Sequence, residues 1–150
     1  MKIFEKHIEI IKFLVNNINI NDFFIAGGIA DYYHFNKLGY DTNLVVGDVD
    51  IVIFKKKTFN EIKSLFSNVK IKLFEEHSLF YLNDNLILDV FFNKNNQEME
   101  LVDCFNMEFN IETIDSRIKL LNNFTNNLLD KKPMYRKNLK YLKKLVYYGL

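Results

Sequence analysis

The stretch that decides the fold is FFIAGGIADYYHF, residues 23–35, read together with VVGDVDIVIF, residues 45–54. The apolar run before Gly27 and Gly28 predicts a short strand, and the residues after the two glycines are typical of a helix that ends near Gly39. A strand that turns into a helix at two glycines leaves backbone N–H groups and the positive end of the helix dipole free for an anion. A tight turn without any ligand is the alternative explanation of such a pair.

Asp48 and Asp50 stand at the entrance of the second apolar run. Because side chains alternate along a strand, the two carboxylates should point to one face and Val49 to the other. Two carboxylates held close together repel one another unless a cation lies between them, and Mg²⁺ prefers such ligands. The alternative is that both aspartates cap a turn at the edge of the sheet.

The rest of the pattern is that of an α+β protein. Helical spacing of apolar residues predicts an N-terminal helix from Phe4 to Val15, and Thr58 with Glu61 predicts a capping box at the start of a later helix. Short β-rich segments separated by polar turns then predict hairpins. We expect strands at 69–74, 78–82, 86–92 and 98–105, and helices at 59–66, 111–129 and 135–150. The expected fold is a mixed or antiparallel sheet flanked by helices, with C-terminal helices.

Length and composition predict a single domain over residues 1–150, because 150 residues with 49% apolar content can fill one core without staples. Cys104 is the only cysteine, which excludes an intrachain disulfide framework and is typical of a buried thiol in a reducing compartment. Glu5 and Glu9 interrupt the N-terminal apolar pattern, unlike a secretory signal, and no apolar run reaches the roughly 18 residues that span a bilayer. We expect a soluble, cytoplasmic protein.

The order of the motifs is more informative than either motif alone. An apolar strand, Gly27–Gly28, a helix, a short loop and then Asp48-x-Asp50 entering a second apolar strand resembles the signature of the nucleotidyltransferase superfamily. That family includes DNA polymerase beta, CCA-adding enzymes and antibiotic-modifying nucleotidyltransferases. The resemblance covers residues 23–105 and has the character of small phage-type members. It implies the nucleotidyltransferase fold, with the two glycines against the triphosphate of an NTP and the two aspartates as metal ligands.

The resemblance also implies a third carboxylate on a nearby strand. Asp89 in NLILDVFF and Asp103 in MELVDCF are both acids embedded in apolar strands, where a carboxylate is out of place without a role. We favour Asp89, because SLFYLNDNLILDVFF resembles the strand pair that carries this acid in the family. A strand-edge residue turned to solvent is the alternative for each.

The implied reaction is metal-dependent. An acceptor hydroxyl would attack the α-phosphate of an NTP in line with the departing pyrophosphate. Asp48, Asp50 and Asp89 would hold Mg²⁺, or Mn²⁺, which would lower the pKa of the hydroxyl and stabilise developing charge. One of these carboxylates would serve as proton acceptor.

Two positions depart from patterns in the family. CCA-adding enzymes carry an arginine a few residues after the glycines, where this chain has Asp31, and this argues against kinship with that branch. Many members have serine as the second residue of the glycine pair, where this chain has Gly28, so a hydroxyl that could touch phosphate is missing.

The C-terminal segment contains no acid beyond Asp130. Apolar residues at helical spacing predict that it buries one side and presents a cationic stripe on the other. Such a stripe suits an RNA or tRNA end, or the phosphates of the nucleotide itself, whereas a solvated helix face is the alternative. The apolar positions are Tyr135, Leu139, Leu142 and Val146, and the cationic positions are Lys131, Lys132, Arg136, Lys137, Lys140, Lys143 and Lys144. His34 and His77 have no partners at a metal-ligand spacing, and we expect them on the surface or in helix packing.

The sequence leaves three functions open. The first is an Mg²⁺-dependent nucleotidyltransferase acting on an RNA end or another hydroxyl acceptor. The second is a catalytically silent nucleotide-binding or regulatory protein, or one component of a toxin–antitoxin pair. The third is a small basic RNA-binding module whose aspartate pair is incidental; its binding should weaken steeply with salt and need no divalent metal.

Overall fold

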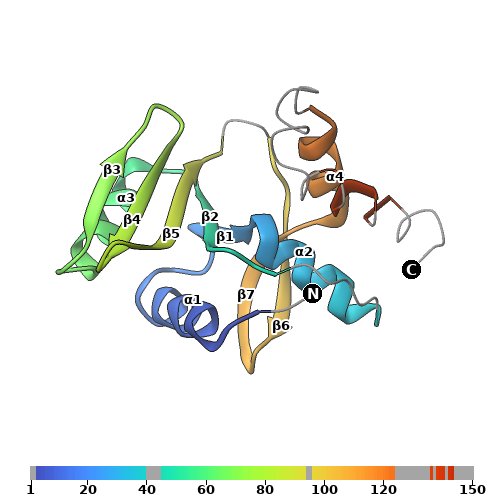
Figure 1. Cartoon of the computed structure of the whole chain (residues 1–150), viewed down its shortest axis with the longest axis horizontal. Helices are drawn as coiled ribbons and strands as arrows, with labels where there is room; N and C mark the ends of the chain where they lie inside the picture. The colour runs from blue at the N-terminus through green and yellow to red at the C-terminus, as the bar shows by residue number, and fades with distance from the viewer. Residues whose placement is uncertain are drawn as a thin grey trace.

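A computed structural model describes residues 3–39, 45–93, 96–123, 136, 138–140, 142 and 143. Within these residues the chain forms one mixed sheet flanked by helices, as expected (Figure 1). The strand order across the seven-stranded sheet of this described part is β3-β4-β5-β2-β1-β7-β6. The strands are β1 (Phe23–Ala26), β2 (Val49–Ile53), β3 (Lys70–Leu73), β4 (His77–Leu82), β5 (Asn85–Phe92), β6 (Met99–Cys104) and β7 (Met107–Glu112); the helices are α1 (Glu5–Asn17), α2 (Gly27–Lys37), α3 (Lys56–Leu65) and α4 (Ile114–Asn123).

The centre of the sheet is built from three strands that are distant in sequence. β2 pairs antiparallel with β1 on one side and parallel with β5 on the other. The register places Asp50 opposite Ala26 and also opposite Asp89. Residues that lie opposite one another project from the same face of a sheet. The topology therefore brings the Asp-x-Asp motif and the acid of β5 to the same face.

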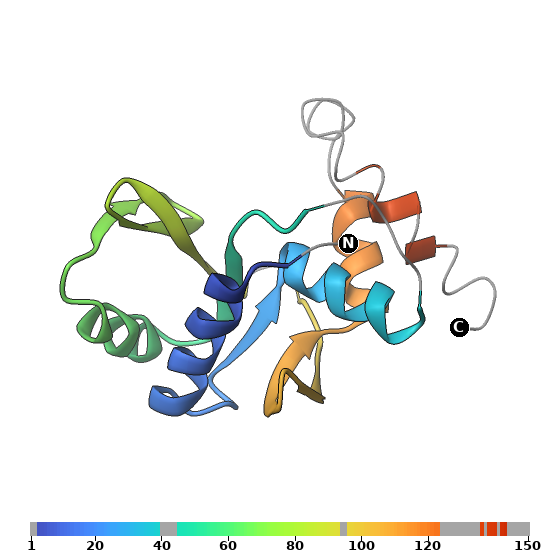
Figure 2. The same ribbon diagram turned by 60° about the horizontal axis from the view of Figure 1, so that its bottom comes forward.

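The other face of the sheet carries the main core. Helices α3, α1 and α2 pack against it, in this order from left to right in Figure 2. The strands contribute apolar side chains that alternate with the residues of the acidic face, and Val49, Ile51 and Ile53 of β2 are all buried here. α4 packs against α2 through a separate cluster around Phe35 and Leu121. The face with the aspartates carries a small apolar cluster of Phe24, Ala26 and Val52, packed against Phe91.

The start of α3 differs from the expectation. The helix begins at Lys56 with Lys55 in the N-cap position, so Thr58 lies inside the first turn and is buried, and the capping box expected with Glu61 is wrong. β2 ends at Ile53, and the backbone of Lys55 is still extended. The chain therefore enters the helix directly from the strand, three residues before the threonine.

A strand was missed between the expected strand 98–105 and the expected helix 111–129. β6 and β7 form a hairpin whose turn residues, Phe105 and Asn106, both have positive φ, at 55° and 59°. Two residues with positive φ suit the twist of a two-residue hairpin, but glycine is the usual signal for such a turn and is absent here. Ile111 and Glu112 consequently belong to β7, and α4 begins only at Ile114.

The expected C-terminal helices fall largely outside the described residues. α4 is described to Asn123, and residues 124–135 lie outside the described part. Between 136 and 143, every residue that the structure describes is helical. No helix in the described part of the chain is long and apolar enough to cross a membrane.

Candidate active site

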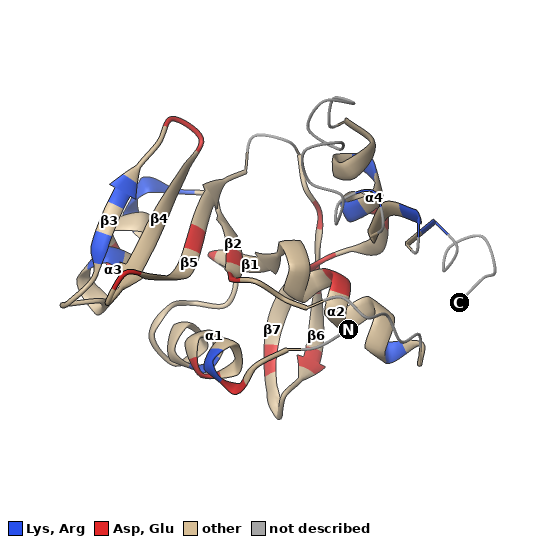
Figure 3. Cartoon of the chain, in the orientation of Figure 1, with Lys and Arg blue, Asp and Glu red and all other residues tan. Residues whose placement is uncertain are grey.

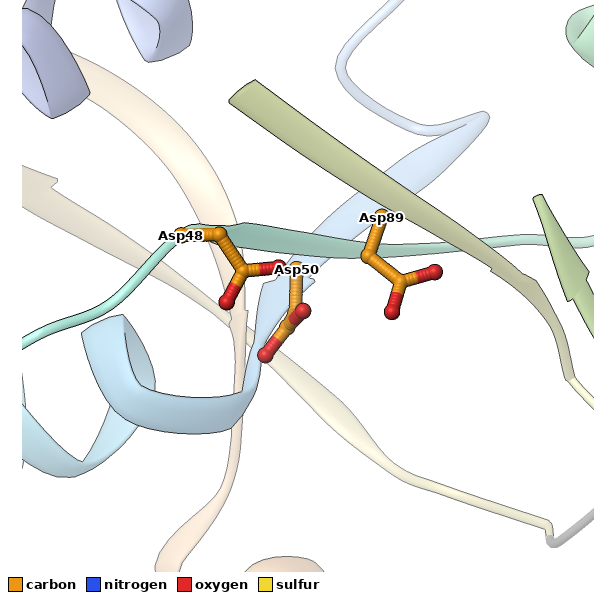
Figure 4. A group of neighbouring side chains, drawn as sticks. All are labelled: Asp48, Asp50 and Asp89. Atoms are coloured by element: carbon orange, nitrogen blue, oxygen red, sulfur yellow. The ribbon is translucent and has the colours of Figure 1, made fainter. Parts of the chain in front are cut away.

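Three carboxylates converge on the face of the sheet opposite the main core. Asp48 immediately precedes β2, Asp50 lies on β2 and Asp89 lies on β5. One oxygen from each lies within 4.8 Å of the others, and Figure 4 shows all three side chains projecting from the same side of these strands. The structure thus brings together the three acids that the sequence singled out as metal ligands.

The carboxylates of Asp48, Asp50 and Asp89 repel one another. Burial raises the pKa of Asp50 well above its usual range, and the negative charges of Asp48 and Asp89 raise it further. A divalent cation among the three would offset that repulsion. An all-oxygen donor set of this size fits Mg²⁺ or Mn²⁺, which take a few carboxylates and complete their shells with water and phosphate oxygens.

Asp103, the alternative third acid, lies away from this group. It is exposed on β6, opposite Glu108, and β6 is separated from β2 by β1 and β7. Its side chain is therefore that of an edge-strand residue turned to solvent. The geometry favours Asp89 over Asp103 as the partner of the aspartate pair.

Gly27 and Gly28 begin α2 directly beneath the carboxylates. Gly27 has φ +61°, and a Cβ at this position would collide with the carboxylate of Asp50. A side chain is therefore excluded here by the backbone conformation and also by the packing of Asp50. A Cβ on Gly28 would meet only Cγ1 of Val46, at 3.8 Å, so that position has room. The N-cap residue Ala26 offers no side-chain cap to the N-terminus of the helix.

His77 is partly exposed, in keeping with the expected surface position, but it also lies beside Asp89, a contact that the sequence did not indicate. Its Nδ1 is 2.8 Å from Oδ1 and 3.1 Å from Oδ2 of Asp89. The two residues lie on neighbouring antiparallel strands, where Leu79, two residues after His77, is directly opposite Asp89. Alternation along the expected strands could have placed them on one face, but only if β4 had been paired with β5 in this register.

His34 is a helix-packing residue, as expected. It is buried on α2, with Nε2 2.7 Å from the backbone oxygen of Glu112, and burial lowers its pKa. Cys104 is half-buried, and burial raises the pKa of its thiol, which is typical of an unreactive structural cysteine.

Sequence reasoning missed a buried ion pair between Arg117 on α4 and Asp31 on α2, the helix that begins at the two glycines. Nε of Arg117 on α4 donates to Oδ1 of Asp31 at 2.8 Å, and Nη2 donates to Oδ2 at 3.2 Å. Asn138 also donates to Oδ2 of Asp31. Burial alone would lower the pKa of Arg117, but the charge of Asp31 and its hydrogen bonds raise it above the usual range. Asp31, which departs from the CCA-adding pattern, thus serves here to connect α2 with α4 and the C-terminal segment.

The cationic stripe expected near the C-terminus is described in part. Arg136, Lys140 and Lys143 are exposed, whereas Leu142 is buried and Leu139 is half-buried. These five residues follow the expected division into a polar and an apolar side. The remaining positions, Lys131, Lys132, Tyr135, Lys137, Lys144 and Val146, lie outside the described residues.

No protein-family model matches the sequence, and no curated protein matches it. The fold, in contrast, matches several solved structures. The lincosamide antibiotic adenylyltransferase LnuA in its lincomycin-bound form aligns with a TM-score of 0.59 and 13% identity, over 95% of this chain and 99% of that chain. ANT(2")-Ia in complex with adenylyl-2"-tobramycin aligns with a TM-score of 0.57 and 12% identity, over 95% of each chain.

A third match is the Megavirus polyadenylate synthase, with a TM-score of 0.58 and 12% identity. The alignment covers 100% of this chain and 37% of that chain. The matched proteins are nucleotidyltransferases, and at these identities the likeness is one of fold. The chain has the nucleotidyltransferase fold, as the order of its motifs indicated.

Proposed function

We propose that this chain is a divalent-metal-dependent nucleotidyltransferase that moves a nucleotidyl group from an NTP to a hydroxyl acceptor. The observation that carries the proposal is the convergence of Asp48, Asp50 and Asp89 within 4.8 Å on one face of the sheet, above the N-terminus of α2. Three acids in such proximity are costly to keep without a cation, so an incidental aspartate pair explains the arrangement poorly.

Each part of the site has a role in this proposal. Asp48, Asp50 and Asp89 hold Mg²⁺ or Mn²⁺, and the metal, when bound, polarises the phosphates and increases the acidity of the acceptor hydroxyl. Gly27 and Gly28 present the backbone at the positive end of α2, which has no side-chain cap, to the triphosphate. The acceptor oxygen forms a bond to the α-phosphorus, the bond to pyrophosphate breaks, and one of the carboxylates takes the hydroxyl proton.

The charges beside the site support an anionic acceptor such as an RNA or tRNA end. Lys72 of β3 lies opposite Leu79, which lies opposite Asp89, so all three project from the same face. At the usual strand spacing the Cα atom of Lys72 is about 10 Å from that of Asp89. Lys70 projects from the same face two residues earlier, and Figure 3 shows this basic strand separated by β4 from β5, the nearer of the strands that carry the acids. Arg136, Lys140 and Lys143 are exposed on the C-terminal segment, which contacts α2 through Asn138 and Asp31.

The test is pyrophosphate release from each of the four NTPs with Mg²⁺ or Mn²⁺ and a mixed tRNA pool. Lincomycin and tobramycin serve as alternative acceptors, because one matched protein is bound to lincomycin and another is in complex with adenylyl-2"-tobramycin. We expect release with at least one pair of NTP and acceptor, and its loss by 10³-fold or more in Asp48→Asn/Asp50→Asn. Asp103→Asn is the matched control, since it removes an exposed carboxylate from another strand of the same sheet.

The other outcomes separate the remaining functions. NTP binding that depends on metal but gives no pyrophosphate with any acceptor would contradict the enzyme and favour a catalytically silent nucleotide-binding or toxin–antitoxin component. RNA binding that survives the double substitution, needs no divalent metal and falls steeply with salt would favour a basic RNA-binding module.

A further inference from the structure

His77 is held in one orientation by two aromatic neighbours. Its ring stacks on Phe91 of β5, with centroids 5.2 Å apart and planes at 15°, and on Phe74, with centroids 5.1 Å apart and planes at 27°. The backbone N–H of Phe74 also donates to the backbone oxygen of His77, closing the connection between β3 and β4. Stacking on two rings fixes the plane of the imidazole and therefore the direction in which Nδ1 points.

That direction leads to Asp89. Because a carboxylate only accepts, Nδ1 carries the hydrogen and donates it to Asp89, at 2.8 Å from Oδ1 and 3.1 Å from Oδ2. The side chain of Asp89 is 11% exposed, and that of His77 is 32% exposed. The hydrogen bond is therefore partly shielded from water, and Nδ1 lies within hydrogen-bond distance of both oxygens of the carboxylate.

The cross-strand neighbours of Asp89 are Asp50 on β2 and Leu79 on β4, and neither of these side chains can donate a hydrogen bond to it while Asp50 is ionised. Leu79 lies directly opposite on β4, and Leu88 and Val90 on either side in the chain point into the main core. The χ2 angle of an aspartate has only a broad preference of its own, so hydrogen-bond donors beside the carboxylate set its orientation. Groups that hydrogen-bond to metal ligands commonly set ligand orientation, and their loss costs roughly 10- to 100-fold in metal affinity or activity.

We propose that His77 is a positioning residue for the third carboxylate, holding Asp89 in the orientation that places one of its oxygens near those of Asp48 and Asp50. This inference rests on the proposed function, because it gives Asp89 the role of a metal ligand. His77 acts through Asp89 and does not touch the substrate. Under this proposal, Asp48 and Asp50 are positioned by β2 and the residue before it. The orientation of Asp89, in contrast, depends on His77 of the neighbouring strand β4.

Two substitutions separate the hydrogen bond from the ring. His77→Gln keeps an N–H donor and loses the stacked ring, whereas His77→Phe keeps the ring and loses the donor. Phe74→Leu is the matched control, since it removes one stacking partner and leaves Nδ1 in place. Thermal unfolding of each variant checks folding, and His77→Leu replaces His77→Phe if the latter does not fold.

The main readout is Mn²⁺ binding to the protein alone, followed by electron paramagnetic resonance. We expect roughly tenfold weaker binding in His77→Phe and less than about threefold change in His77→Gln and Phe74→Leu. In turnover assays, His77→Phe should raise the metal concentration needed for half-maximal rate and lower kcat, with the KM for NTP little changed. Unchanged Mn²⁺ binding in His77→Phe, or an equal loss in His77→Gln, would overturn the proposal.

The binding experiment also distinguishes the two proposals. If the native chain releases no pyrophosphate but His77→Phe weakens Mn²⁺ binding and His77→Gln does not, the proposed function fails and the positioning role stands. If pyrophosphate release is native in His77→Phe at every Mn²⁺ concentration, the positioning role fails and the proposed function stands.

Discussion

The carboxyl group of Asp50, on β2, lies close to those of Asp48 and Asp89. Burial and the neighbouring acids raise its pKa well above the usual range, so the ionised form is unfavourable in the folded protein when no cation is bound. An asparagine at this position keeps nearly the same shape and removes one of the three charges. A side chain that is kept for function despite such repulsion commonly lowers the stability of the folded protein.

We therefore expect Asp50→Asn to stabilise the metal-free protein while abolishing turnover. For a chain of this length, each kcal/mol of repulsion removed should raise the thermal midpoint by about 2–4 °C. Mg²⁺ should raise the midpoint of the native chain and leave that of the variant nearly unchanged, since binding to the folded state stabilises it. Differential scanning calorimetry with and without Mg²⁺ makes the comparison. A lower midpoint in the metal-free variant would contradict this account of the site.

The two glycines differ in what they tolerate, although they are adjacent in the sequence. A side chain at Gly27 would collide with Asp50, and the residue carrying it would have to keep a left-handed backbone conformation. A Cβ at Gly28, in contrast, would meet only Val46, at van der Waals distance. The first glycine is therefore required by the fold of the site. The second has no comparable structural requirement, and under the proposed function its small size would serve the approach of the triphosphate.

Alanine substitutions should reveal this difference. We expect Gly27→Ala to destabilise the protein by about 1–3 kcal/mol and to abolish turnover, because strain and the collision act together. Gly28→Ala should keep or slightly raise stability, since alanine favours the helix, yet raise the KM for NTP several-fold. Urea unfolding and steady-state kinetics measure both effects. A Gly28→Ala variant with native KM would show that the triphosphate does not approach this residue.

At the scale of single residues, the sequence located the acids better than it located their neighbours. Asp48 and Asp50 could be placed on one face because alternation along a strand is local. The contact of His77 with Asp89 depends on the pairing of β4 with β5, including a register shift between Phe80 and Tyr81. No local pattern specifies such a register.

At the scale of elements, the prediction succeeded where apolar periodicity was strong and failed where a boundary depended on backbone conformation. β2 and β5 were expected at nearly their observed positions because their apolar runs are long. β7 was missed because its hairpin turn uses Phe105 and Asn106 at positive φ without a glycine. The parallel pairing of β2 with β5 joins strands separated by α3, β3 and β4, and this arrangement completes the acidic group.

At the scale of the whole molecule, one buried ion pair joins parts of the chain that are far apart in sequence. Arg117 and Asp31 are 86 residues apart and lie on α4 and α2, and Asn138 brings the C-terminal segment to the same carboxylate. α2 begins at Gly27, so this contact connects the C-terminal part of the chain to the helix that underlies the site. The pairing could not be predicted, because neither residue carries a local signal of its distant partner.

A double-mutant cycle measures what this ion pair contributes to the fold. Arg117→Met leaves Asp31 buried and without its cation, which should lower the free energy of unfolding by about 3–5 kcal/mol. Asp31→Asn still accepts from Asn138 but leaves the buried guanidinium without its charge partner. The double substitution removes both charges, so it should cost clearly less than the sum of the two single substitutions. Urea unfolding gives the four values, and additive losses would mean that the pair does not couple α2 to α4.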